Sequence, residues 1–92
     1  MKILHKTITA DTAVYVGDCY FIGADLYHTT DTNMIIYNEA TATKTAAQII
    51  AKPAVTDEMQ NCNITIPLPG IKCEGIYVDW TAGLGTIYYA IA

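Results

Sequence analysis

The sequence predicts an all-β fold, either a small antiparallel β-sandwich or a jelly-roll-like barrel of seven to eight short strands. Thr, Ile and Tyr, which favour the pleated strand as Val does, are among the commonest residues of the chain. Short apolar or alternating runs recur about every ten residues, and turn-forming residues separate them. The 92 residues form a single domain, residues 1–92, because a chain of this length has room for one core.

The amino-terminal residues predict an extended segment at the edge of a sheet. Residues 3–9 alternate between the two faces, as a strand does, and after a polar break residues 14–16 return to strand-forming types. Gly17 and Asp18 then predict a bulge or a tight turn, because both residue types are favoured where regular pairing is interrupted.

Residues 19–28 are the longest expected strand. Regular alternation would put five of these residues on one face: Cys19, Phe21, Gly23, Asp25 and Tyr27. A glycine inside such a run indicates a bend or the close packing of a neighbouring chain. Residues 29–33 are typical of a turn, and residues 33–38 predict a short strand with apolar side chains on both faces.

The middle of the chain is less regular. Residues 39–45 are small and polar and predict a loop. Residues 46–52 fit either a strand or a helical turn; a strand is favoured, because the neighbouring segments are strands and a helix of two turns would be marginal. Pro53 ends the segment in either case, and residues 55–60 are expected to be an extended connection.

Three further strands are expected in the last third of the chain. Residues 61–67 alternate cleanly, which predicts a half-buried strand. Its inward side chains would be Cys62, Ile64 and Ile66. Residues 76–81 and 86–92 predict two more strands, and the Gly-containing turn at 82–85 predicts that they pair as a hairpin.

Charge and termini exclude several classes of partner and location. The formal net charge is −4, arginine is absent, and the five lysines are scattered. Nucleic acids and anionic membranes attract clustered basic residues, so neither is expected as a partner. The sequence contains no apolar run of the roughly 18 residues that a membrane helix needs, and its first residues do not form a signal peptide, so synthesis in a reducing cytosol is expected.

The residues that could support catalysis or metal binding are not grouped. Three cysteines and two histidines lack the spacings that gather metal ligands, and an odd cysteine count argues against a disulfide framework. Serine is absent, and no cysteine lies in a positive environment that would activate it. Most carboxylates fall in expected turns, where they cap backbone N–H groups. We therefore expect no enzyme activity, no metal and no cofactor.

The low charge and the last strand together predict a homo-oligomer. Charged residues make up 15% of the chain, against roughly 25% in an average soluble domain, so few are available to cover the surface. Residues 86–92 carry no charge and are apolar or aromatic on both faces, so they are expected either to be central in the sheet or to be covered by a partner. The expected interface residues are Ile3, Leu4, Trp80, Leu84, Ile87, Tyr88, Tyr89 and Ile91. Three alternative roles are open to the seven tyrosines and the tryptophan: filling the core, forming a subunit interface, or providing a surface on which sugars stack.

Three segments resemble small β-sandwich virion proteins of tailed bacteriophages and prophages. They are VGDCYFIGADLY (16–27), NMIIYNEA (33–40) and PLPGIKCEGIYVDWTAGLGTIYY (67–89). The residues that carry the resemblance are Gly17, Cys19, Gly23, Tyr37, Gly70, Cys73, Gly75, Tyr77, Val78, Asp79, Gly83, Tyr88 and Tyr89. They are structural in character and contain no catalytic signature.

The resemblance implies a capsid decoration (cement) protein that stabilises the head shell, often as a trimer. The implied partners are the major capsid protein and further copies of the chain, and the implied location is the capsid surface of the virion after synthesis in the bacterial host cytoplasm. The alternative is a receptor- or glycan-binding accessory module on a phage head or tail fibre. Such a module would use exposed Tyr and Trp near Asp or Asn, in the loops at 29–33 and 39–45.

Overall fold

A computed structural model describes all of residues 1–92. Eight strands form one sheet in which every strand pair is antiparallel. They are β1 (Lys2–Ile8), β2 (Thr12–Tyr27), β3 (Thr32–Tyr37), β4 (Ile49–Ala51), β5 (Ala54–Val55), β6 (Asn61–Thr65), β7 (Ile71–Trp80) and β8 (Leu84–Ile91). The one helical element is a single 3-10 turn, η1 (Ala46–Gln48). The expected all-β, antiparallel fold is confirmed.

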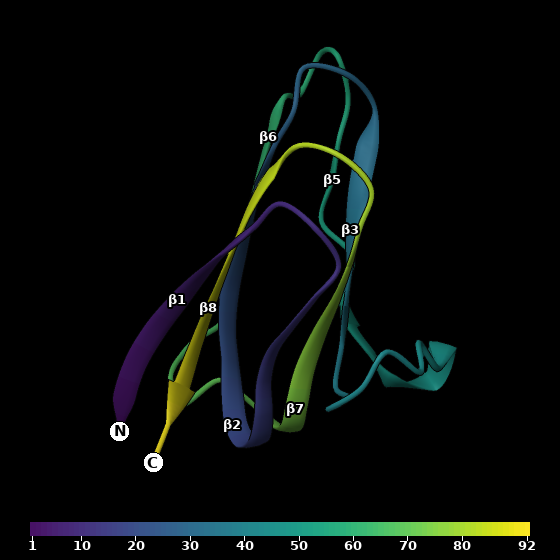
Figure 1. Ribbon diagram of the computed structural model, residues 1–92. Coiled ribbons are helices and arrows are strands. Elements are labelled where there is room, and N and C mark those ends of the chain that lie inside the picture. The colour runs from purple at the N-terminus through teal and green to yellow at the C-terminus, as the bar shows by residue number, and fades with distance from the viewer.

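The sheet folds over on β2, which gives the molecule a sandwich-like form (Figure 1). The first part of β2 descends beside β7, turns at Gly17 and Asp18, and rises beside β8. The pairing of β2 with β7 shifts register between Val16 and Cys19, so the expected bulge is confirmed. A bulge increases the local bend of a strand, and this one allows β2 to pass from one layer to the other.

Two layers result from this bend. Layer A contains β1, β8, the second part of β2 and β6, in that order. Layer B contains the first part of β2, then β7, β3 and β4, and β5 pairs with the start of β3. Inward side chains of both layers form the core, in which Phe21, Leu26 and Ile36 are fully buried. No polar or charged residue is buried there.

The expected hairpin of the last two strands is wrong. β7 and β8 are not neighbours, because β2 lies between them in the sheet. The turn after Trp80 therefore crosses from layer B to layer A instead of joining two paired strands. The indole N–H of Trp80 donates a 2.9 Å hydrogen bond to the carbonyl oxygen of Gly83, which holds this crossing in place.

The expected alternation of residues 19–28 is also wrong in its second half. Phe21 is buried, but the next buried side chains are Ala24 and Leu26, so the inward face changes parity. The register of β2 against β8 shifts between Phe21 and Gly23, and one extra residue in a strand moves every later side chain to the opposite face. Asp25 consequently lies on the outer surface of layer A.

The ambiguous segment 46–52 divides into two structures. Its first part is the turn η1, closed by a 2.9 Å hydrogen bond from the Gln48 backbone N–H to the Thr45 carbonyl oxygen. Its second part is β4, which pairs with β3, so the favoured strand holds for that half alone. Residues 61–67 alternate as expected within β6, and Cys62, Ile64 and Ile66 are half-buried because β6 has a neighbour on one side only.

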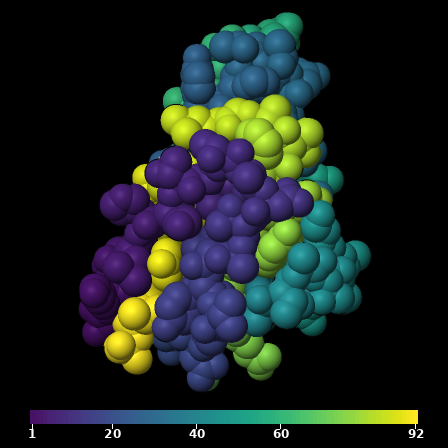
Figure 2. Space-filling model, in the orientation of Figure 1, coloured from purple at the N-terminus to yellow at the C-terminus, as the bar shows by residue number.

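The carboxyl-terminal strand β8 is central, between β1 and β2. Both of its edges are therefore paired within the chain, and no partner is needed to cover it. Ile87 and Tyr89 point into the core, where Ile87 has no exposed surface and Tyr89 is 8% exposed. The two chain ends lie together, since Lys2 pairs with Ile91, and Figure 2 shows them side by side at one margin of the molecule.

No helix of the protein has the length and apolar character required to cross a membrane.

Candidate functional site

A groove of about 410 Å³ lies on the outer surface of layer A. Side chains from β1, β2, β6 and β8, together with the turn that follows β6, surround it. Its lining residues are Ile3, Ile22, Gly23, Asp25, Asn63, Ile64, Thr65, Ile66, Leu68 and Tyr88. The groove therefore combines a polar centre with an apolar rim.

Gly23 forms part of the floor of the groove. In the sheet it lies between Tyr88 of β8 and Thr65 of β6. A Cβ atom at this position would lie 2.6 Å from the carbonyl oxygen of Ile64, closer than real Cβ contacts. The absence of a side chain thus lets β6 approach β2 and leaves space between the Tyr88 and Thr65 side chains.

Asp25 is the centre of a polar network that joins three strands. Its Oδ2 accepts a 2.8 Å hydrogen bond from the Tyr88 hydroxyl, and its Oδ1 accepts one from the Asn63 amide. The Oδ1 of Asn63 accepts a 2.9 Å hydrogen bond from the Thr65 hydroxyl. The hydrogen bond to Asp25 raises the pKa of Tyr88, with burial as a smaller cause.

Two exposed apolar side chains flank this network. Ile3 of β1 is 56% exposed and Leu68 is 63% exposed, and both line the groove. Carboxylate, amide and hydroxyl groups together can accept and donate hydrogen bonds, and neighbouring apolar side chains can cover the less polar parts of a ligand. The groove therefore offers a ligand both hydrogen-bonding groups and apolar contacts.

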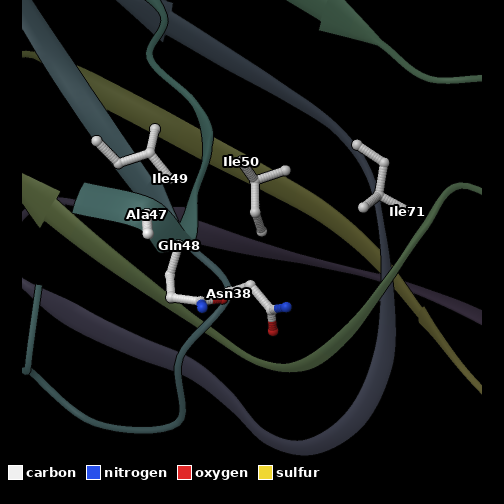
Figure 3. A pocket seen from close by; sticks show the side chains of 6 residues that line it. All are labelled: Asn38, Ala47, Gln48, Ile49, Ile50 and Ile71. Carbon is white, nitrogen blue, oxygen red and sulfur yellow. The ribbon is translucent and has the colours of Figure 1, made fainter. Parts of the chain in front are cut away.

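A second hollow of about 290 Å³ lies where η1 and β4 approach the start of β7 (Figure 3). The side chains of Ile49, Ile50 and Ile71 occupy one side, and the amide side chains of Asn38 and Gln48 occupy the other. The Asn38 backbone N–H donates a 2.8 Å hydrogen bond to the Gln48 carbonyl oxygen, which closes this side. No charged residue lines the hollow.

The loop between β3 and η1 is held to the sheet by one lysine. Lys44 Nζ lies 3.3 Å from Asp11 Oδ2 and 3.5 Å from Asp79 Oδ1. Asp11 Oδ1 also accepts a 2.8 Å hydrogen bond from the Trp80 backbone N–H, which is the main reason that the pKa of Asp11 is lowered; Lys44 adds to the effect and partial burial opposes it. Nowhere do three His, Cys, Asp or Glu side chains converge to hold a metal ion.

The eight expected interface residues do not form one surface. Ile3 and Tyr88 meet in the groove, and Leu84 is exposed at the other end of β8. Three are half-buried against the core: Leu4, Trp80 and Ile91. Ile87 and Tyr89 are core residues and are unavailable to a partner. Of the two alternatives expected for residues 86–92, the structure has the central strand, so these two side chains face the core.

Sequence reasoning missed Asp25, Asn63 and Thr65 as members of one site. Two signals were present: an aspartate inside a strand-forming run, where this residue is depleted, and polar side chains on the outer face of residues 61–67. The pairing of β6 with β2 was needed to bring them together.

Comparisons with protein-family models, with curated proteins and with solved structures found no match.

Proposed function

We propose that this protein is a structural accessory protein of a bacteriophage virion, a decoration protein that binds the outer surface of the head shell and stabilises it. The observation that carries the proposal is a set of exposed apolar side chains at the end of the molecule where both chain termini lie. The set, named here the apolar base, is Met1, Ile3, Val16, Leu68 and Ile71.

Three members of the apolar base line two neighbouring surfaces: Ile3 and Leu68 line the groove of layer A, and Ile71 lines the hollow beside η1. Ile3 pairs with Ala90, Ala90 with Tyr20, and Tyr20 with Lys72, so β1 and β7 begin in the same row of the sheet. Leu68 lines the same groove as Ile3, and the fold of β2 beside Val16 is at this end in Figure 1. Apolar side chains gathered on a small protein favour contact with another protein.

A shell lattice suits a surface of this kind. Each protomer offers a small apolar contact, and many copies on a symmetric lattice strengthen attachment without a deep pocket. We propose a homotrimer bound to the major capsid protein as the working state, with the apolar base toward the shell. The net charge of −4 would keep the outward surfaces soluble.

Quantitative mass spectrometry of purified virions from the source lysate tests the proposal. A decoration protein is expected at about one copy per major capsid subunit, or at a simple fraction of that number set by the lattice symmetry. Absence of the chain from the particles would contradict a virion role, and a few copies per particle would place it on a tail or fibre.

Surface variants test which end binds. Leu68→Asp puts a charge into the apolar base and should abolish rebinding to particles stripped of the protein. Met59→Asp is the matched control, because Met59 is similarly exposed, at 69%, in the loop between β5 and β6 at the opposite end. Equal loss in both variants would contradict the apolar base as the binding surface.

A glycan-binding accessory module is the second candidate, and the groove of layer A favours it. The carboxylate of Asp25, the amide of Asn63 and the hydroxyl of Thr65 are groups that can hydrogen-bond to sugar hydroxyls. This site differs from the expected loops at 29–33 and 39–45. Trp80 is half-buried, is hydrogen-bonded to Gly83 and lies outside the groove, so its fluorescence would be a poor reporter of sugar binding there.

A saccharide titration followed by amide NMR tests this second function. Binding in the groove would shift the amide signals of Gly23, Asp25 and Thr65, and Asp25→Ala would remove those shifts. Glu58→Gln, in an exposed loop outside the groove, would leave them unchanged. If a panel of neutral and acidic sugars produces no shifts at these amides, the groove is not a glycan site.

A further inference from the structure

Cys19 of β2 and Cys73 of β7 are direct partners across the antiparallel ladder. Each side chain is 1% exposed, so both point to the inward face of the sheet. Partners of this kind have Cα atoms about 4.5 or 5.5 Å apart, according to their hydrogen-bonding pattern. Both separations lie within the roughly 4.4–6.8 Å that a disulfide spans. We propose that Cys19 and Cys73 form an intramolecular disulfide when the protein meets a small-molecule disulfide oxidant.

The surroundings of the pair allow the two sulfur atoms to meet. In the reduced protein the Cys73 thiol donates a 3.3 Å hydrogen bond to the carbonyl oxygen of Ile71. Rotation about χ1 of Cys73 breaks this bond and redirects its Sγ. The bulge between Val16 and Cys19 adjoins the pair and gives the backbone of β2 local freedom to adjust.

The third cysteine lies outside this pair. Cys62 is half-buried in β6, where its ladder partner is Leu26. The odd cysteine count is therefore consistent with one disulfide and one remaining thiol, although it argues against a framework of several bridges.

The reaction is a thiol–disulfide exchange with oxidised glutathione as the oxidant. One cysteine thiolate attacks the glutathione disulfide, forming a mixed disulfide and releasing one glutathione thiolate. The second cysteine thiolate attacks the protein sulfur of the mixed disulfide and releases the other glutathione. The two cysteines lose two electrons to the glutathione pair, and the protons of the two thiols pass to the two departing thiolates.

Because both cysteines are buried, the exchange is slow, and the disulfide that it forms links two core strands. Oxidant reaches the sulfurs when β2 and β7 separate locally, so the rate depends on opening of the native state. The bridge then joins β2 to β7 immediately after the turn between the layers, and it closes a loop that contains β3 to β6. Such a link stabilises the folded state mainly by restricting the unfolded chain.

Peptide mapping identifies the bridge without ambiguity. Trypsin cuts after lysine and not before proline, so each cysteine falls in a separate peptide: residues 7–44, 45–72 and 73–92. The full chain is incubated with oxidised glutathione, alkylated and digested without reductant. We expect peptides 7–44 and 73–92 to be joined, peptide 45–72 to be alkylated, and the melting temperature of the oxidised chain to rise.

Two variants keep the outcome decisive. Cys62→Ser leaves the pair and should still lose two thiols and the mass of two hydrogen atoms, whereas Cys73→Val, which keeps an apolar side chain of similar size, should retain its free thiols. A bridge that contains Cys62, or three free thiols after prolonged incubation of the wild-type chain with the oxidant, would overturn the proposal. Neither result depends on whether the protein binds a capsid.

Discussion

The hydroxyl of Tyr88 and the carboxylate of Asp25 form a 2.8 Å hydrogen bond across the ladder of β8 and β2. Tyr88 itself pairs with Gly23, so the contact is diagonal and passes over the position that lacks a side chain. The carboxylate accepts a hydrogen bond from the protonated phenol and so disfavours loss of the phenolic proton, which raises the pKa of Tyr88.

Asp25→Asn should therefore lower the pKa of Tyr88 toward its ordinary range, because a neutral amide stabilises the protonated phenol less than a carboxylate does. Site-resolved NMR titration of the tyrosine rings measures the change. Glu58→Gln provides the control and should leave the titration of Tyr88 where it is. An identical Tyr88 titration in Asp25→Asn would mean that the hydrogen bond is absent in solution.

Alanine at Gly23 should destabilise the protein more than alanine at Gly85. At Gly23 the new Cβ would meet the carbonyl oxygen of Ile64 at 2.6 Å, and strand β6 would have to move. At Gly85 it would meet Met34 Sδ at 2.5 Å, and the end of this flexible side chain can yield. Overpacking costs typically about 1–3 kcal/mol, so urea unfolding can rank the two variants. The reverse order would show that β6 is held loosely.

Phe21→Ala should lower the free energy of unfolding by about 3–5 kcal/mol, because the Phe21 side chain is fully buried. The residue lies near the fold of β2 and pairs with β7 on one side and β8 on the other. Val16→Ala provides the comparison on the same strand. Val16 is 67% exposed, so its truncation should change stability by no more than about 0.5 kcal/mol. Chemical denaturation of both variants measures the difference, and similar losses would place Phe21 outside the core.

Stability should fall in acid partly through Asp11. Its pKa is lowered in the folded protein from 3.8, chiefly by the Trp80 backbone N–H. The unfolded chain therefore takes up the proton first as the pH falls, and the stabilisation present above the unfolded pKa is lost as the pH drops through the folded pKa. Asp11→Asn should show a smaller loss of stability between about pH 5 and pH 2 than the wild type.

Lys44→Ala tests the order of the causes at Asp11. Because the Trp80 N–H is the main cause and Lys44 a smaller one, this variant should keep most of the acid dependence. Added salt should likewise have little effect on the acid dependence of stability. If removal of Lys44 abolishes the acid dependence, the ion pair is the main cause.

Alkaline pH should weaken the fold through the buried cysteines. Burial raises the pKa of Cys19 from 9.0 to about 11, with the nearby Cys73 and Asp18 as smaller causes. Between these values the unfolded chain has lost the thiol proton and the folded chain retains it, so unfolding becomes easier as the pH rises. Cys19→Val should flatten this part of the stability profile measured by urea unfolding. An unchanged profile would mean that the thiol ionises freely in the folded state.

Much of the strand content could be predicted from the sequence, because strand propensity and alternation are local properties. The bulge at Gly17 and Asp18 and the alternation of β6 were predictable for this reason. Pairing order is not local: the turn after Trp80 has the composition of a hairpin, yet it crosses between layers because β2 occupies the place beside β7. The second register shift, between Phe21 and Gly23, also depends on the pairing of β2 with β8, which local sequence patterns do not predict.

The candidate site was less predictable than the fold. Ile3 and Tyr88 were expected at a surface and do line the groove. Asp25 belongs to the site because Asn63, which is distant in the chain, is its neighbour across the ladder. Alternation alone put Asp25 on the same face as Phe21, and the extra residue between them reverses that placement.

The position of β8 between β1 and β2 governs the order in which the protein can fold. Lys2 pairs with Ile91 and Tyr20 with Ala90, so layer A is incomplete until β8 has been synthesised. Pairings between such distant residues require large loops to close first, which slows folding relative to a protein of local hairpins. During synthesis β1 and the second part of β2 remain unpaired on the side that β8 later occupies. A truncation before β8 should accordingly yield an aggregating chain instead of a smaller folded domain.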